Sequence, residues 1–162
     1  MGYSGGKGVA IIFVLLLMIG TAGIFVIGTA LSELNPDPYN VNHEYSYTGT
    51  LYGEDCTGKG STTFADENAN YHTYMVKIEL TNASGKTDEI KSGVIFNLDE
   101  TMIPELFKLI GKDKIGDTEV DVYEFDDSQK GVVYRYFVAE LCTIMKITAV
   151  SNDYDIVGIL TE

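Results

Sequence analysis

Tryptophan is absent from this chain of 162 residues, which also contains only two cysteines, two histidines and three prolines. Two cysteines and two histidines leave almost no material for a metal cage, so we expect neither a metal site nor a cofactor. Basic residues are also scarce, since 11 Lys+Arg stand against 24 Asp+Glu and give a formal net charge of −13. This balance excludes a nucleic-acid partner, because binding to phosphates needs a basic surface.

Residues that would indicate an enzyme are missing or lack partners. The segment from Gly53 to Lys59 spells the GxxxxGK of a phosphate-binding loop, but Gly60 stands where that loop needs a hydroxyl side chain. His43 and His72 have no obvious partner in the sequence. The many carboxylates include no pair that the pattern marks for acid–base chemistry. We therefore expect a non-catalytic protein.

One long uncharged run lies near the N-terminus. Residues 8–31 read GVAIIFVLLLMIGTAGIFVIGTAL and contain no charged side chain. Roughly 20 apolar residues in a helix cross the hydrocarbon core of a membrane. The run therefore predicts a single transmembrane helix over residues 8–31.

The charges on either side of this run predict its orientation. Lys7 precedes it, and no Lys or Arg follows until Lys59. All 24 acidic residues and the other ten basic residues lie after the run. The positive-inside rule places residues 1–7 in the cytoplasm and the C-terminal part outside the cell membrane. The outer part then carries a formal net charge of −14.

Two cleaved forms compete with an uncleaved anchor. Gly28-Thr29-Ala30 offers the small residues that a signal peptidase reads. The short leader that ends at Lys7-Gly8, directly before the apolar run, resembles the class III signals of archaeal type IV pilins and archaellins. That resemblance implies cleavage just before the helix and assembly of the helices into a filament. Glycines within the run would let a second helix approach closely, so a homo-oligomer could form through this segment: Gly20, Gly23 and Gly28.

After the run, the sequence changes to a linker and then to a domain rich in strands. Residues 32–42 contain Pro36 and Pro38 and predict a short stiff spacer. Residues 43–162 form the predicted outer domain. Within 72–81 the side chains of Tyr74, Val76, Ile78 and Leu80 alternate with polar ones, which is typical of a half-buried strand. Similar patterns predict strands over 43–53, 60–65, 90–97, 118–125, 132–138, 143–150 and 154–161.

One helix is predicted among these strands. From Thr101 to Gly111 the apolar residues recur at helical spacing, Pro104 suits an early helical position and Gly111 suits a stop. Short turns between successive strands favour antiparallel pairing. The predicted fold class is therefore α+β, with an N-terminal transmembrane helix followed by a mainly antiparallel, curved sheet and one packed helix over 101–111.

Two features concern covalent chemistry outside the cell. Cys56 and Cys142 are the only cysteines and lie in the outer part, which predicts a disulfide in an oxidising compartment. The alternative is two separate buried thiols. Asn82-Ala83-Ser84 is an N-glycosylation sequon in a predicted turn, so Asn82 is a candidate for modification.

The C-terminal strands carry a family resemblance. The strand segments concerned are 123–125, 133–138, 145–147 and 154–157. Their succession resembles that of LolA/LppX-like half-barrel lipoproteins and lipid carriers, in which a curved sheet encloses a lipid-binding cavity. The resemblance implies an apolar ligand, and we take Tyr134, Tyr136 and Val138 as the candidate ligand-facing residues. A solid core would instead bury them against the predicted helix, and with about 120 residues to build from we favour that outcome.

Taken together, these features predict a single-pass membrane protein whose outer domain binds an apolar ligand or another protein of the cell envelope. The alternatives are a pilin-like subunit of a surface filament and a lipid carrier of the LolA-like type.

Overall fold

The computed structural model describes residues 39–67 and 69–161, which belong to one structural unit, Asp37–Glu162. The predicted transmembrane helix over 8–31 and most of the predicted linker lie outside the described residues. Within the described part of the chain, no helix has the length and apolar character needed to cross a membrane.

Nine strands make up the described fold, and every pair of neighbours is antiparallel, as predicted. They are β1 (His43–Leu51), β2 (Glu54–Glu67), β3 (Tyr71–Asn82), β4 (Thr87–Asn97), β5 (Lys108–Ile115), β6 (Thr118–Asp127), β7 (Val132–Val138), β8 (Ile144–Val150) and β9 (Tyr154–Leu160). A strand lies at every predicted position, but β2 begins six residues before the predicted 60–65 and β5 was not predicted as a strand.

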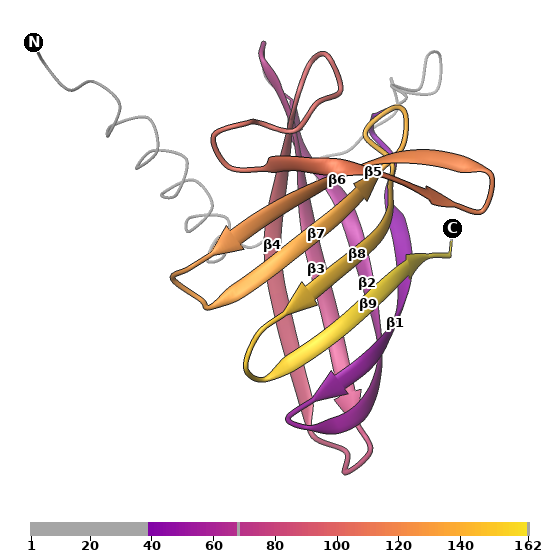
Figure 1. Ribbon diagram of the computed structural model, residues 1–162, viewed down its shortest axis with the longest axis vertical. Coiled ribbons are helices and arrows are strands. Elements are labelled where there is room, and N and C mark those ends of the chain that lie inside the picture. The colour runs from indigo at the N-terminus through magenta and orange to yellow at the C-terminus, as the bar shows by residue number, and fades with distance from the viewer. Residues whose placement is uncertain (1–38, 68, 162) are drawn as a thin grey trace, which may run out of the picture. The chain divides into compact units, whose positions relative to one another are not determined.

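The nine strands form a single sheet that is folded over itself. Its order is β4-β3-β2-β1-β9-β8-β7-β6-β5, so two meanders are joined where β1 pairs with β9. Figure 1 shows β6–β9 crossing in front of β2–β4. Side-chain contacts join the two layers: the Ser92 and Tyr136 hydroxyls are 3.3 Å apart, and the Tyr45 hydroxyl donates to the Ile144 carbonyl at 2.6 Å.

Alternation along the strands builds the core between these layers. On β3 the side chains of Tyr74, Val76, Ile78 and Leu80 are buried, whereas Lys77 and Glu79 are exposed. On β3 the period of two places these four apolar side chains on one face, and the fold turns that face inward. The interior that results is rich in tyrosine, and Tyr45, Tyr47, Tyr134 and Tyr136 are among its largest fully buried side chains.

The predicted helix over 101–111 is wrong, and the described domain is all-β rather than α+β. Only one helical turn begins there, where the Phe107 amide donates to the Ile103 carbonyl at 2.9 Å. The chain then extends into β5, and Gly111 lies at a bulge in that strand instead of ending a helix. Pairing with β6 gives every β5 residue except Ile110 a partner along the strand, whereas a helix of about ten residues is marginal by itself. The burial of Met102, Ile103 and Phe107 explains the helical spacing.

Strand β5 forms one edge of the sheet and is exposed along its length. Leu109 and Ile110 remain 54% and 43% exposed. Three lysines lie on the same strand, Lys108, Lys112 and Lys114. Lysines on an edge strand oppose pairing with another chain, so we place no binding site there.

Candidate functional site

The three candidate ligand-facing residues lie side by side on the inner face of β7 and belong to the core. Tyr134, Tyr136 and Val138 are 1%, 0% and 5% exposed. The rings of Tyr134 and Tyr136 stack with centroids 6.0 Å apart, and Phe107 packs edge-on against Tyr136 at 5.9 Å. Their faces are taken by protein side chains, in agreement with the solid core that we favoured, although a loop rather than a helix covers them.

The two cysteines are both free and buried, so the structure does not support the predicted disulfide. Cys56 lies near the start of β2, paired with Gly49 and Asn82, whereas Cys142 lies in the turn between β7 and β8. Burial, with a smaller contribution from the Glu100 carboxylate, raises the pKa of the Cys142 thiol to about 12. Such a thiol stays protonated and is a poor nucleophile.

The candidate glycosylation site points inward. Asn82 is 6% exposed, and its amide nitrogen donates to the Leu51 carbonyl at 3.4 Å. Its side-chain oxygen accepts from the Ser84 hydroxyl at 2.9 Å and from the Lys86 amide at 2.8 Å. These contacts shape the turn between β3 and β4, so Asn82 has a structural role that competes with modification of the folded domain.

The two histidines lie at the starts of strands. His43 begins β1, and His72 is the second residue of β3. His72 is 3% exposed and stacks on Tyr39 with ring centroids 4.3 Å apart. Tyr39, which the sequence assigns to the linker, therefore packs on the domain. Among the described residues, no group of three or more histidine, cysteine or acidic side chains is placed to hold a metal ion.

A groove of about 380 Å³ opens where three parts of the chain meet. The first part of β4 forms one wall, and the β6–β7 and β8–β9 turns form the other. We call this hollow the β4 groove. Its lining includes the side chains of Asp88, Ile90, Lys130, Val132, Tyr134, Asp153 and Tyr154.

Local turn chemistry holds both turns of the β4 groove in place. In the β8–β9 turn, the Ser151 hydroxyl accepts from the Asp153 and Tyr154 amides at 3.1 and 3.2 Å. In the β6–β7 turn, Asp127 Oδ1 accepts from the Lys130 amide at 3.2 Å. Short polar side chains of this kind accept hydrogen bonds from backbone amides two or three residues further along the chain, and these bonds fix the conformation of the turn.

The β1–β2 turn links the two walls of the β4 groove. Tyr52, which has a positive φ of 56°, donates its amide to the Asp153 carbonyl at 2.6 Å. Its hydroxyl donates to Asp88 Oδ2 at 2.9 Å. Tyr52 thus fixes the Asp88 carboxylate on one wall and the backbone of Asp153 on the other, which the sequence alone does not reveal.

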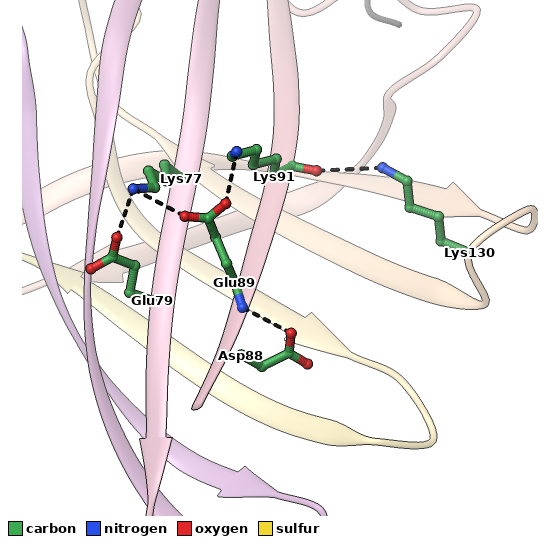
Figure 2. A network of polar contacts seen from close by, with 6 residues as sticks. All are labelled: Lys77, Glu79, Asp88, Glu89, Lys91 and Lys130. Carbon is green, nitrogen blue, oxygen red and sulfur yellow. Dashed lines mark hydrogen bonds and ion pairs between the residues drawn. The ribbon is translucent and has the colours of Figure 1, made fainter. Parts of the chain in front are cut away.

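The charged side chains around the β4 groove divide into paired and unpaired groups. Lys91 pairs with Glu89 at 2.7 Å, and Lys77 pairs with the same carboxylate at 3.0 Å. Lys130 lies 3.6 Å from Asp127. It also donates to the Lys91 carbonyl at 3.4 Å, a contact drawn in Figure 2. Asp88 and Asp153 take part in no ion pair with any described residue. The charge left at the mouth of the groove is therefore negative.

Two phenols line the floor of the β4 groove. The Tyr134 hydroxyl is buried and makes no hydrogen bond of normal geometry with a described residue. Burial raises the pKa of Tyr134, and the neighbouring Tyr154 adds to the rise. Burial also raises the pKa of Tyr154, with a smaller contribution from the Asp88 carboxylate. Both phenols stay neutral at physiological pH and can accept or donate a hydrogen bond.

Sequence reasoning found Tyr134 but missed its companions in the β4 groove. Ser151-Asn152-Asp153 and the segment 126–131 were recognisable as turns. Their meeting with Asp88 depends on how the sheet folds over, and no local pattern reports that contact.

The comparisons with known proteins give no family. No family model matches the chain, and no curated protein matches it. A solved structure entitled "Structure of PNGF-II in C2 space group" is similar at 11% sequence identity and a TM-score of 0.31, over 75% of this chain and 27% of that chain. A likeness at this level carries no argument about fold or function.

Proposed function

We propose that residues 43–161 form a non-catalytic binding domain that the apolar segment 8–31 anchors at the outer face of a membrane. The observation that supports binding is the β4 groove, where two unpaired carboxylates stand above a floor with a buried phenol. Pockets of about 300 Å³ or more that combine apolar surface with a few polar groups are typical of ligand sites. The interior supports a surface site rather than a lipid cavity, because Tyr134, Tyr136 and Val138 pack against protein.

Binding predicts that some ligand class stabilises the purified full-length chain in a non-ionic detergent. A panel of amines, amino acids, saccharides, short-chain lipids and peptides would be tested by thermal unfolding. At a free concentration of about 100 Kd, a true ligand adds about 2.7 kcal/mol and raises Tm by roughly 10 °C. The variant D153K, which changes the charge of an exposed groove residue, should lose that shift. The proposal fails if every class leaves Tm unchanged, or if the variant responds as strongly as the wild type.

The anchored topology predicts the outcome of protease treatment of intact cells that produce the protein. Residues 1–7 should be protected and the outer domain should be degraded, leaving a short stub in the membrane, because Lys7 directly precedes the apolar run and no basic residue follows it until Lys59. Mass spectrometry of the N-terminus also separates the alternatives. A start at Gly8 or Val9 would support the pilin-like subunit, and a start at Leu31 would indicate a secreted domain. Full protection of the domain would contradict the proposed orientation.

A further inference from the structure

We propose that the β4 groove binds a small aliphatic ammonium ligand of the diamine class, with an ammonium group held by Asp88 and Asp153 and its carbon chain against Ile90, Val132 and Tyr134. This inference rests on the proposed function and adds the chemical class of the ligand.

The charge of the groove selects a cation. Both lysines on its lining have acidic partners, Lys91 with Glu89 and Lys130 with Asp127, whereas Asp88 and Asp153 have no ion pair with any described residue. Asp88 is already oriented, because its two oxygens accept from the Tyr52 hydroxyl and the Glu89 amide at 2.9 and 2.8 Å. These neutral donors fix the carboxylate without removing its charge. An anionic ligand would meet two uncompensated carboxylates, and the net charge of −14 on the outer part would repel it further.

The floor of the groove gives a second, independent indication of a polar ligand atom. The Tyr134 hydroxyl lies in a side chain only 1% exposed, and its contact with the Tyr154 hydroxyl falls short of a hydrogen bond of normal geometry. An unsatisfied buried hydroxyl costs roughly 1–3 kcal/mol. An ammonium N–H donated to the Tyr134 oxygen would recover part of that cost.

The other lining groups favour an organic cation over a metal ion. The described residues place no cluster of three or more side chains suited to a metal. Ile90 and Val132 are 7% and 3% exposed and supply apolar surface on the groove floor. A diamine of four or five carbons matches these features, because it joins an apolar chain to ammonium ends and fits within about 380 Å³.

The test is a titration of the isotope-labelled full-length chain in non-ionic detergent micelles, followed by backbone amide NMR. The probe is 1,4-diaminobutane, and the matched control is 1,4-butanediol, which has the same chain without charge. The diamine should shift the amides of Lys130, Gly131 and Asn152 in a saturable way, and the diol should not. Equal shifts with the diol would overturn the inference, as would no saturable shift with the diamine.

Variants separate this site from general attraction to an acidic protein. D88N and D153N should each weaken diamine binding by about tenfold, which corresponds to about 1.4 kcal/mol. The control D117N removes an exposed carboxylate from the β5–β6 turn and should leave the affinity unchanged. Y134F keeps the ring but removes the oxygen, and it should weaken binding severalfold while the diol remains inactive. If D117N weakens binding as much as D88N, the attraction is non-specific and the inference is wrong.

The two proposals can fail separately. If the diamine does not bind but another class in the panel stabilises the wild type and not D153K, the binding function stands and the ammonium ligand is wrong. If no class binds, both proposals fail.

Discussion

Replacement of Gly158 by alanine is expected to lower the stability of the domain by about 3 kcal/mol, because overpacking a filled core forces its neighbours to move. Gly158 lies on β9 directly beside Tyr47 of β1, and a Cβ at this position would overlap Tyr47 Cε1 and Cζ. The ring cannot retreat easily, since Tyr47 is 1% exposed and also covers Gly60 on β2, where a Cβ would stand 2.6 Å from Cε2. Thermal unfolding should show a fall in Tm of roughly 10 °C or more.

A double-mutant cycle tests whether Tyr47 is the cause. In the Y47L background, which removes the ring, the added cost of G158A should fall below about 1 kcal/mol. The neighbouring I159A is a matched control, because Ile159 is 44% exposed and its loss should change stability by no more than about 0.5 kcal/mol. Additive costs for Y47L and G158A would show that the glycine is required for another reason.

The same Tyr47–Gly158 contact illustrates what the sequence could and could not predict. Alternation on β3 and β7 predicted strands and their inward faces correctly, because burial on one face imposes a period of two on the residues themselves. Nothing in the local pattern indicates that Tyr47 needs glycine on two neighbouring strands. That requirement arises only from the register between β1, β2 and β9.

The wrong helix over 101–111 has a similar origin. Met102, Ile103 and Phe107 point inward from a loop, and their spacing happens to match a helical face. The signal that favours a strand is the Gly116-Asp117 pair after Ile115, which is typical of a two-residue hairpin turn. Gly116 has a φ of 60°, so it uses the left-handed conformation that such a turn requires. The β4 groove could not be predicted either, and the reason is a different one: it is formed by turns that are distant in the sequence.

Raising the pH above about 10 is expected to unfold the domain cooperatively. Burial raises the pKa of Tyr45 to about 12 and raises the pKa values of Tyr47, Tyr134 and Tyr136 further. In the unfolded chain these phenols ionise near their ordinary pKa of about 10, whereas in the folded domain they stay protonated. The stability that depends on neutral tyrosine is therefore intact below pH 10 and is lost as the pH rises from there toward the folded pKa values.

The expected loss is steep. Each tyrosine that is ionised only in the unfolded state costs about 1.4 kcal/mol per pH unit, so four of them cost about 5–6 kcal/mol per unit. This exceeds the effect of any single surface charge and approaches the whole stability of a typical domain. Circular dichroism should lose the strand signal in the same narrow pH interval in which ultraviolet absorbance reports phenolate formation. Gradual titration of all tyrosines without loss of the strand signal would contradict the prediction, because it would mean that the four buried phenols ionise within the folded domain.

Two tyrosine-to-phenylalanine variants make this prediction specific to buried hydroxyls. The Tyr47 hydroxyl is buried without a hydrogen-bond partner among the described residues, so Y47F should keep full stability at neutral pH and reduce the alkaline slope by about a quarter. The Tyr45 hydroxyl donates to the Ile144 carbonyl at 2.6 Å, so Y45F should reduce the slope similarly but cost about 1 kcal/mol at neutral pH. Both variants remove one buried hydroxyl, and they differ in whether that hydroxyl donates a hydrogen bond. An equal free-energy cost at neutral pH would therefore contradict the hydrogen bond from Tyr45 to the Ile144 carbonyl.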